Sequence, residues 1–228
     1  MLFRDGKTIS EIRSILNEKG HDLSSFDTFV NETISGKFLS LLNGRQISAI
    51  RKFTGADVHK INDALRNLRE GTEYMIIADD IIESLAKAPP LGYDMLVYRG
   101  TDVNALLADK NIKKLLNFNG NVLSNSEELY ISVKKLIGLK IRDLGFLSTS
   151  PGYETSFAVR DNKNIVFEII VPDGTKGAYI NQISDFYNKE NEYLLSYGTT
   201  LRIINVSYSN KKKVHIQCIV ESQLSPSE

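Results

Sequence analysis

Three groups of residues between positions 99 and 192 have types and spacings that could do chemistry. They are Arg99 near the end of MLVYRG, the hydroxyl run Ser148, Thr149 and Ser150 near the end of GFLSTSP, and the acidic pair Glu190 and Glu192 in DFYNKENEYLL. A guanidinium suits phosphate, hydroxyls can orient a carboxylate, and a carboxylate pair can stabilise a cation and accept a proton. Because all three lie at predicted strand ends, one cleft could bring them together.

Each group also has an ordinary interpretation. An arginine at a strand end is commonly a surface charge, a Ser-Thr-Ser run is commonly a turn, and a Glu-x-Glu pair is commonly solvated. Residues two apart share one strand face, so Glu190 and Glu192 are expected to point the same way. A polar loop with Phe186 and Tyr187 precedes the pair and an apolar run follows it. The pair is therefore predicted at a junction between loop and core strand, where a substrate could reach it.

Several other chemistries find no support in the sequence. The histidines, His21, His59 and His215, are far apart and lack partners at metal-ligand spacing. No G-x-S-x-G elbow, Walker loop or G-x-G-x-x-G fingerprint occurs. The single cysteine, Cys218, lies in the alternating run VHIQCIV and is predicted to be a small core residue rather than a nucleophile.

Charge and hydropathy narrow the range of partners. The 28 basic residues balance 28 acidic ones, which argues against a sequence-independent grip on nucleic acid or on an anionic membrane. The lysines at 211–213 are predicted to form a solvated hairpin turn, because no aromatic residue interleaves with them. No uncharged run approaches the roughly 20 residues that span a bilayer, so membrane insertion by this chain is not expected. The amino terminus has no apolar stretch of signal-peptide length.

The chain is predicted to be one α+β domain with helices first and a sheet second. Its 228 residues can bury a substantial core without disulfides or metals. Helical periodicity dominates the first third, for example in Val58, Ile61, Leu65 and Leu68, and short helices are expected over 105–116 and 127–137. Strands are predicted over 95–99, 139–142, 146–149, 164–171, 177–180, 192–196, 200–208 and 214–220. This order favours helices packed on a mostly antiparallel sheet.

The ordered trio resembles the mono-ADP-ribosyltransferase toxins of the Arg, Ser-Thr-Ser, Glu-x-Glu class. The resemblance covers residues 47–206 and includes AIRKFTG, INDALR, LVYRG, GFLSTS, FAVR and VPDGTKGAYI before the Glu-x-Glu strand. It is closest to the enzymatic components of actin-modifying binary toxins, with the Rho-modifying exoenzymes next. The resemblance implies an ADP-ribosyltransferase-like fold, with N-terminal helices on a mostly antiparallel two-sheet core, and NAD as co-substrate.

The resemblance also implies roles for individual residues. Arg99 would hold the NAD phosphates, Ser148 would position Glu192, and Glu192 would hold the nicotinamide-ribose hydroxyl and stabilise an oxocarbenium ion. Thr149 and Ser150 would shape the cofactor cleft. In FAVR, Phe157 falls where relatives carry an aromatic beside the nicotinamide, although it could equally pack in the core, and Arg160 falls where they carry a second arginine near the phosphates.

Glu190 would select the acceptor, since a glutamate there resembles arginine-modifying enzymes and a glutamine resembles asparagine-modifying ones. An arginine side chain, with a pKa above about 12, becomes nucleophilic only if a base receives its proton. Phe186 or Tyr187 resembles the exposed aromatic that touches the protein substrate, although each could simply pack the loop. The expected acceptor is an arginine of a host protein, with actin as first choice. The alternatives are a Rho-type GTPase target, an NAD glycohydrolase and a non-catalytic binding module.

Two departures from the family bear on these expectations. Phe53 and Val58 stand where relatives commonly have tyrosines, so NAD affinity or acceptor choice could differ. Binary-toxin enzymes carry a further domain for docking to a translocation pore, so a translocation partner is left open. Residues 1–44 are expected to be an N-terminal helical extension and 45–222 the catalytic core of one domain. The resemblance implies a bacterial toxin or effector that is secreted or delivered into the host cytosol.

Overall fold

The computed structural model describes residues 36–92, 94–103, 110–116, 126–153, 163–184, 191–209 and 212–225. Its helices are α3 (Gly36–Ser40), α4 (Gly44–Thr54), α5 (Val58–Arg66), α6 (Glu73–Ala86), α8 (Lys110–Leu116) and α9 (Ser126–Val133), with short 3₁₀ turns η3 (Lys134–Leu136) and η4 (Asn181–Ile183). Its strands are β1 (Met95–Thr101), β2 (Lys140–Asp143), β3 (Leu147–Thr149), β4 (Ile165–Val171), β5 (Gly177–Tyr179), β6 (Tyr193–Leu195), β7 (Thr199–Tyr208) and β8 (Val214–Ser222).

The strands form two sheets. One has five strands in the order β1-β4-β8-β7-β2, and the other has three in the order β3-β6-β5. Among these neighbours only β4 and β8 run parallel. The prediction of an α+β fold with helices on a mostly antiparallel two-sheet core is confirmed, and each predicted strand is present to within two residues at either end.

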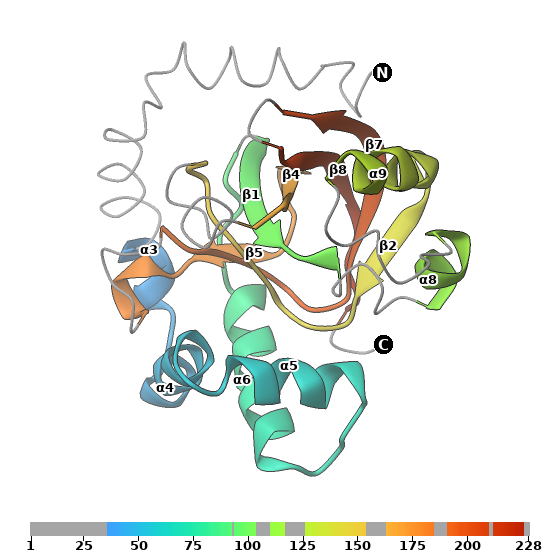
Figure 1. The fold of residues 1–228 in the computed structure, drawn as a ribbon. Helices are drawn as coiled ribbons and strands as arrows, with labels where there is room; N and C mark the ends of the chain where they lie inside the picture. Colours follow the sequence, from blue (N-terminus) through green and yellow to red (C-terminus); the bar gives the residue numbers. More distant parts are fainter. Residues whose placement is uncertain are drawn as a thin grey trace.

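The two sheets and the helices stack in layers (Figure 1). Side chains from β1, β4, β7 and β8 pack against Leu147, Tyr193 and Leu195 of the three-stranded sheet, and α8 and α9 extend the same core. The opposite face of the three-stranded sheet, with Ala178 and Leu194, packs on α4, α5 and α6. The three-stranded sheet is therefore covered on both faces, and its central strand β6 is accordingly apolar and buried at three successive positions.

Helix α4 starts at a well-defined cap. The Asn43 side chain accepts from the Gln46 backbone amide while the Gln46 side chain accepts from the Asn43 backbone amide, a capping box that starts α4.

Helix α5 ends earlier than its apolar periodicity predicts. The prediction that Leu68 belongs to the apolar face of this helix was wrong, because Leu68 lies beyond Arg66, the last residue of α5, and is 69% exposed. The backbone φ of Leu68 is 49°, a left-handed conformation that stops the helix before this residue can join its face.

The β7–β8 connection is a hairpin, as predicted. The Ser209 amide donates to the Lys213 carbonyl at 2.9 Å, and Lys212 takes a φ of 57° at the turn. Lys212 is exposed, but Lys213 is only 7% exposed, so the expectation of a fully solvated lysine run was wrong at this residue. Lys211 lies outside the described residues.

Cys218 provides a first prediction. Its side chain is fully buried, as expected of a core residue, and burial raises the pKa of the thiol. The reactive thiolate is therefore disfavoured in the folded protein. We expect an aromatic disulfide reagent at pH 8 to titrate no thiol in the native protein and one thiol per chain in guanidinium. Rapid native labelling would contradict this core placement.

Candidate active site

The strand register places Ser148 and Glu192 on one face of the three-stranded sheet. Ser148 is directly opposite Leu194 in the β3–β6 ladder, and Glu192 precedes Leu194 by two residues. Because side chains alternate along a strand, Ser148 and Glu192 are diagonal neighbours on that face. The Glu192 carbonyl accepts from the Ile180 amide at 3.0 Å, and only 5% of Glu192 is exposed. The carboxylate is thus held by a paired backbone in a largely buried position.

A second set of contacts brings Arg99 to the same place. The backbones of Tyr98 and Ser150 exchange hydrogen bonds of 2.7 and 2.8 Å, which join β1 of the larger sheet to the end of β3. The Arg99 Nη1 group donates to the Ser148 carbonyl at 2.7 Å. The Thr149 hydroxyl donates to the Tyr193 carbonyl at 2.6 Å and so holds β3 against β6. The two sheets therefore meet where the three predicted groups lie.

A pocket of about 670 Å³ opens at this meeting point. It is lined by Arg99, Ser148, Thr149, Ser150 and Glu192, together with Phe53, Thr54, Gly55, Val58, His59, Tyr98, Gly100, Thr101, Asp102, Lys163 and Asn191. The wall from α4 and α5 includes Phe53 and Val58, where the resemblance expected tyrosines. This wall is therefore apolar at the two positions where a hydroxyl could have met a ligand.

The charges around Arg99 act in both directions. Burial lowers the pKa of its guanidinium and Arg66 lowers it further, while Asp143 and Glu192 raise it. The two carboxylates thus favour the charged guanidinium that an anionic ligand needs. Arg99 and Glu192 are close enough to influence each other electrostatically, as a site for a ligand with both an anionic and a cationic part requires.

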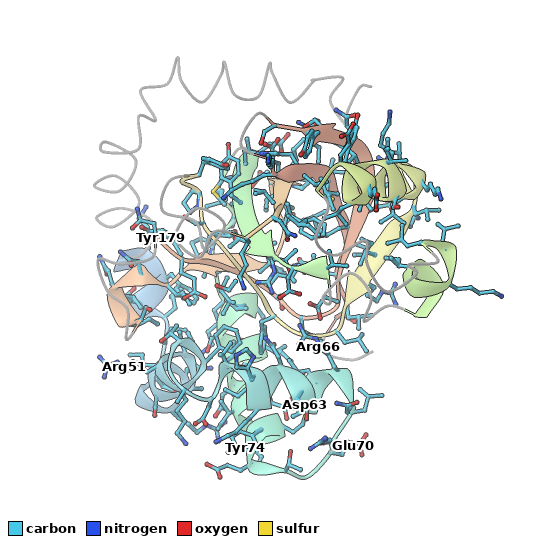
Figure 2. The ribbon with its side chains drawn as sticks, viewed as in Figure 1. Arg51, Asp63, Arg66, Glu70, Tyr74 and Tyr179 are labelled. Atoms are coloured by element: carbon cyan, nitrogen blue, oxygen red, sulfur yellow. The ribbon has the colours of Figure 1, made fainter. Side chains whose placement is uncertain are left out.

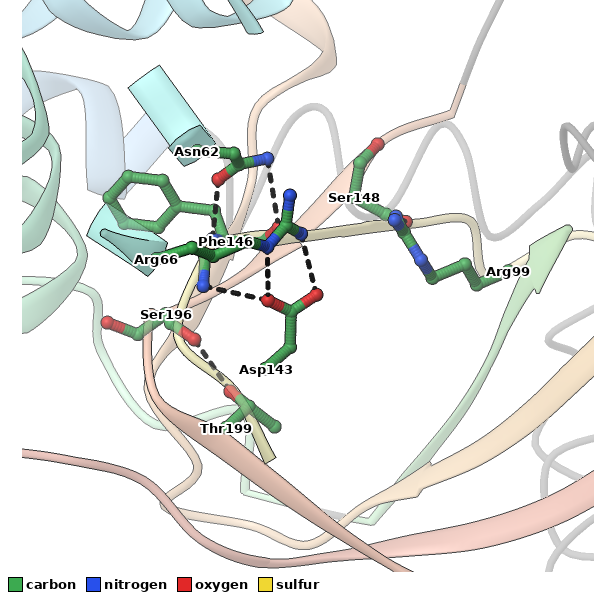
Figure 3. A network of polar contacts seen from close by, with 9 residues as sticks. Asn62, Arg66, Arg99, Asp143, Phe146, Ser148, Ser196 and Thr199 are labelled. Carbon is green, nitrogen blue, oxygen red and sulfur yellow. Dashed lines mark hydrogen bonds and ion pairs between the residues drawn. The ribbon is translucent and has the colours of Figure 1, made fainter. Parts of the chain in front are cut away.

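The position of Ser148 depends on the crossover, which we define as residues 143–146, where the chain passes from β2 to β3. Helix α5 holds the crossover (Figure 3). Arg66 donates from Nε and Nη2 to the two Asp143 carboxylate oxygens, each at 2.8 Å. Asn62, one helical turn earlier, accepts from the Phe146 amide at 2.8 Å, and its Nδ2 lies 3.5 Å from the Phe146 carbonyl. The Gly145 amide donates to Asp143 at 2.8 Å.

The structure brings together those predicted site residues that it describes. The five predicted residues that the structure describes all line one pocket: Arg99, Ser148, Thr149, Ser150 and Glu192. The other five predicted residues lie outside the described residues: Glu190, Phe157, Arg160, Phe186 and Tyr187. Their placement stays a prediction.

Three residues that shape the site have no role that the sequence predicts. In the sequence, Asn62 and Arg66 are simply two polar residues of INDALR, and Asp143 follows the predicted strand 139–142. The available signal was the spacing of Asn62 and Arg66, because two polar residues four apart on an amphipathic helix share one face. What they touch, 77 to 84 residues away, could not be read from that spacing.

Two features are absent from the part of the chain that the structure describes. No helix there is long and apolar enough to cross a bilayer. The same part of the chain contains no group of three or more His, Cys, Asp or Glu side chains arranged to hold a metal ion.

Comparison with known families identifies the class of protein to which this fold and this pocket belong. The family model of the ADP-ribosyltransferase exoenzymes matches residues 17–224. The chain belongs to this family, and NAD, the predicted co-substrate, is the ADP-ribose donor that membership implies. Among curated proteins, no sequence relative was found.

Solved structures of toxins share the fold. Plx2a, an ADP-ribosyltransferase toxin from Paenibacillus larvae, is 23% identical with a TM-score of 0.73, over 88% of this chain and 97% of that one. The C3 exoenzyme of Clostridium limosum is 21% identical with a TM-score of 0.69, over 97% and 98% of the two chains. BECa, from a binary enterotoxin of C. perfringens and solved with NADH, is 20% identical with a TM-score of 0.67, over 88% of this chain and 48% of that one. This chain therefore aligns with about half of BECa.

Asp143 provides a prediction on stability. Burial alone would raise the pKa of its carboxyl, but Arg66, the Gly145 amide and the charge of Arg99 outweigh burial and lower it. A lowered folded-state pKa stabilises the protein above the unfolded value of about 3.9, and this contribution is lost as pH falls through the folded-state pKa. We expect Asp143→Asn to lower the free energy of unfolding by about 1 to 2 kcal/mol at pH 6.

The stability difference should shrink as the pH falls below about 4. Urea denaturation of both proteins between pH 3 and pH 7 measures it. A difference that stays constant over this range would show that the Asp143 charge does not stabilise the fold.

Proposed function

We propose that this chain is an NAD-dependent mono-ADP-ribosyltransferase that transfers ADP-ribose to an arginine of a host protein. The observation that carries the proposal is the convergence of Arg99, Ser148 and Glu192, from β1, β3 and the start of β6, on one pocket. Membership of the exoenzyme family supports the activity. The arginine acceptor rests on Glu190, which stands where asparagine-modifying relatives have glutamine.

NAD fits the chemistry of this pocket. Its volume lies in the range of about 300 to 1,000 Å³ that is usual for small-molecule sites. The Arg99 guanidinium supplies a cation for the pyrophosphate, and the buried Glu192 carboxylate supplies an anion for the ribose that becomes positively charged. Ser148, the diagonal neighbour of Glu192, is placed to orient that carboxylate.

The proposed reaction has two bond changes. The bond between the ribose C1′ and the nicotinamide nitrogen breaks, its electron pair leaves with nicotinamide, and Glu192 stabilises the oxocarbenium ion. A guanidinium nitrogen of the acceptor arginine then bonds to C1′, and the proton that this nitrogen loses passes to Glu190. A low-dielectric setting strengthens the interaction of Glu192 with the cation, because only 5% of the residue is exposed.

The remaining predicted residues complete the proposal. In this proposal Phe157 would contact the nicotinamide, Arg160 would contact the phosphates, and Phe186 or Tyr187 would contact the protein substrate. Thr149 and Ser150 shape the cleft, and both are hydrogen-bonded within the scaffold. We place the catalytic core at residues 45–222.

The two glutamates make a paired prediction. Glu192→Gln should abolish both NAD hydrolysis and transfer, a loss of at least about a hundredfold, because the cation loses its counter-charge. Glu190→Gln should keep hydrolysis and lose transfer to arginine, because an amide cannot accept the proton. Nicotinamide release and labelling of an arginine acceptor measure the two activities.

A matched control is available in Glu70→Gln, which makes the same chemical change on the outer loop of the helical layer, far from the strands (Figure 2). This variant should behave as the unaltered protein in both assays. Undiminished arginine transfer by Glu190→Gln would refute the assignment of the acceptor.

Actin is the first choice of acceptor protein, and a Rho-type GTPase is the second. We expect labelled NAD to modify an actin-sized band in a host-cell lysate, with the label on arginine after peptide mapping. A label on asparagine of a small GTPase would replace actin with the second choice. Nicotinamide release without any labelled protein would indicate an NAD glycohydrolase, and calorimetry showing no NAD binding would indicate a non-catalytic module.

Delivery into the host cytosol, by secretion and with or without a translocation partner, follows from the acceptor being a host protein. Membership of the toxin family supports this part of the proposal.

A further inference from the structure

The hydrogen bonds between helix α5 and the crossover reach the active site through the chain itself. Phe146, which Asn62 holds at its amide, is two residues before Ser148. The Ser148 carbonyl in turn accepts from the Arg99 guanidinium at 2.7 Å. A shift of the crossover would therefore move the acceptor that fixes one end of this guanidinium.

The crossover is tightly packed against α5. A Cβ atom on Gly145 would lie 2.7 Å from the Asn62 Oδ1 atom and 3.1 Å from the Arg66 Nη2 atom. The first distance is shorter than packed atoms allow, and both side chains already make directed hydrogen bonds to the crossover. Gly145 is thus the residue that lets the chain approach the helix this closely.

Electrostatic interactions also link α5 and the crossover to Arg99. Arg66 lies close enough to lower the pKa of Arg99, and Asp143 lies close enough to raise it. The side chain of Asp143 is 25% exposed, so water screens its charge only in part. The negative charge of Asp143 therefore offsets the positive charge of Arg66, which would otherwise repel Arg99.

We propose that Arg66 and Asp143 are positioning residues for the phosphate-binding arginine. Their ion pair holds the crossover at the distance from α5 that places the Ser148 carbonyl, and it balances charge so that Arg99 keeps one orientation in the pocket. Neither residue needs to touch NAD for this effect. The inference rests on the proposed role of Arg99 in binding NAD, and it adds the elements that set the geometry of that role.

Three variants disturb the arrangement in different ways. Asp143→Asn removes the charge and keeps an acceptor for the Gly145 amide. Arg66→Lys keeps the charge and loses the forked pair of donors. Gly145→Ala changes no charge and pushes the crossover away from α5. The matched control is Asp63→Asn, also on α5, which breaks the 2.9 Å ion pair of Asp63 with Arg69 beyond the end of the helix, where both side chains are about half exposed.

NAD hydrolysis by the purified, folded chains provides the measurement. Loss of a contact that stabilises bound substrate and transition state equally raises KM and leaves kcat nearly unchanged. We expect Asp143→Asn and Gly145→Ala each to raise the KM for NAD by about tenfold, with a smaller fall in kcat, because misplacement of about 1 Å costs up to a hundredfold. Arg66→Lys should fall between these variants and Asp63→Asn, which should stay within about twofold of the unaltered chain.

The outcomes separate positioning from simple stabilisation. A purely structural ion pair would lower the melting temperature and leave the KM for NAD of the folded fraction within about twofold, and this result would overturn the inference. If Asp143→Asn does not fold, Gly145→Ala and Arg66→Lys decide by the same criterion. An unaltered chain that neither binds nor hydrolyses NAD would overturn the proposed function first. An Arg99→Ala chain with normal NAD affinity would overturn the role of Arg99.

Discussion

The hydrogen bonds from Asn62 and Arg66 to the crossover are the contacts on which the rest of the site depends. A chain that leaves one sheet for another exposes backbone groups that no ladder pairs, and burial makes such groups costly unless a side chain satisfies them. The Asn62 side chain accepts a hydrogen bond from the Phe146 backbone amide, and Arg66 donates hydrogen bonds to both carboxylate oxygens of Asp143. One helix face thus ties the helical layer, the three-stranded sheet and the larger sheet together.

This arrangement also explains how opposite charges coexist in the pocket. The buried Glu192 and the half-buried Arg99 would each be unfavourable alone, because burial disfavours the charged form of both. Each has a compensating partner within electrostatic reach, and Asp143 offsets the additional charge of Arg66. The strands hold these groups apart in fixed directions, so the pocket can meet an anionic and a cationic part of one ligand without rearranging.

The strands were largely predictable because their signal is local. Runs such as IVFEIIV and VHIQCIV combine branched side chains with turns on either side. The first forms β4 and the second forms most of β8. The helix of INDALR was predictable from its apolar period, but its end was not. Leu68 matches the period and yet lies outside the helix, because the left-handed backbone at this residue, not its hydrophobicity, decides where α5 stops.

The sequence by itself determined which residue types were available for chemistry, their order along the chain and the family that they resemble. It predicted Arg99, Ser148 and Glu192 as one site, because local patterns placed each at the end of a strand. Only the tertiary structure decided how they meet: the β3–β6 register sets the diagonal of Ser148 and Glu192, and the Tyr98–Ser150 bridge brings in β1. The tertiary structure alone also revealed the contacts of Arg66 and Asp143, since a hydrogen bond across 77 residues leaves no local periodicity to detect.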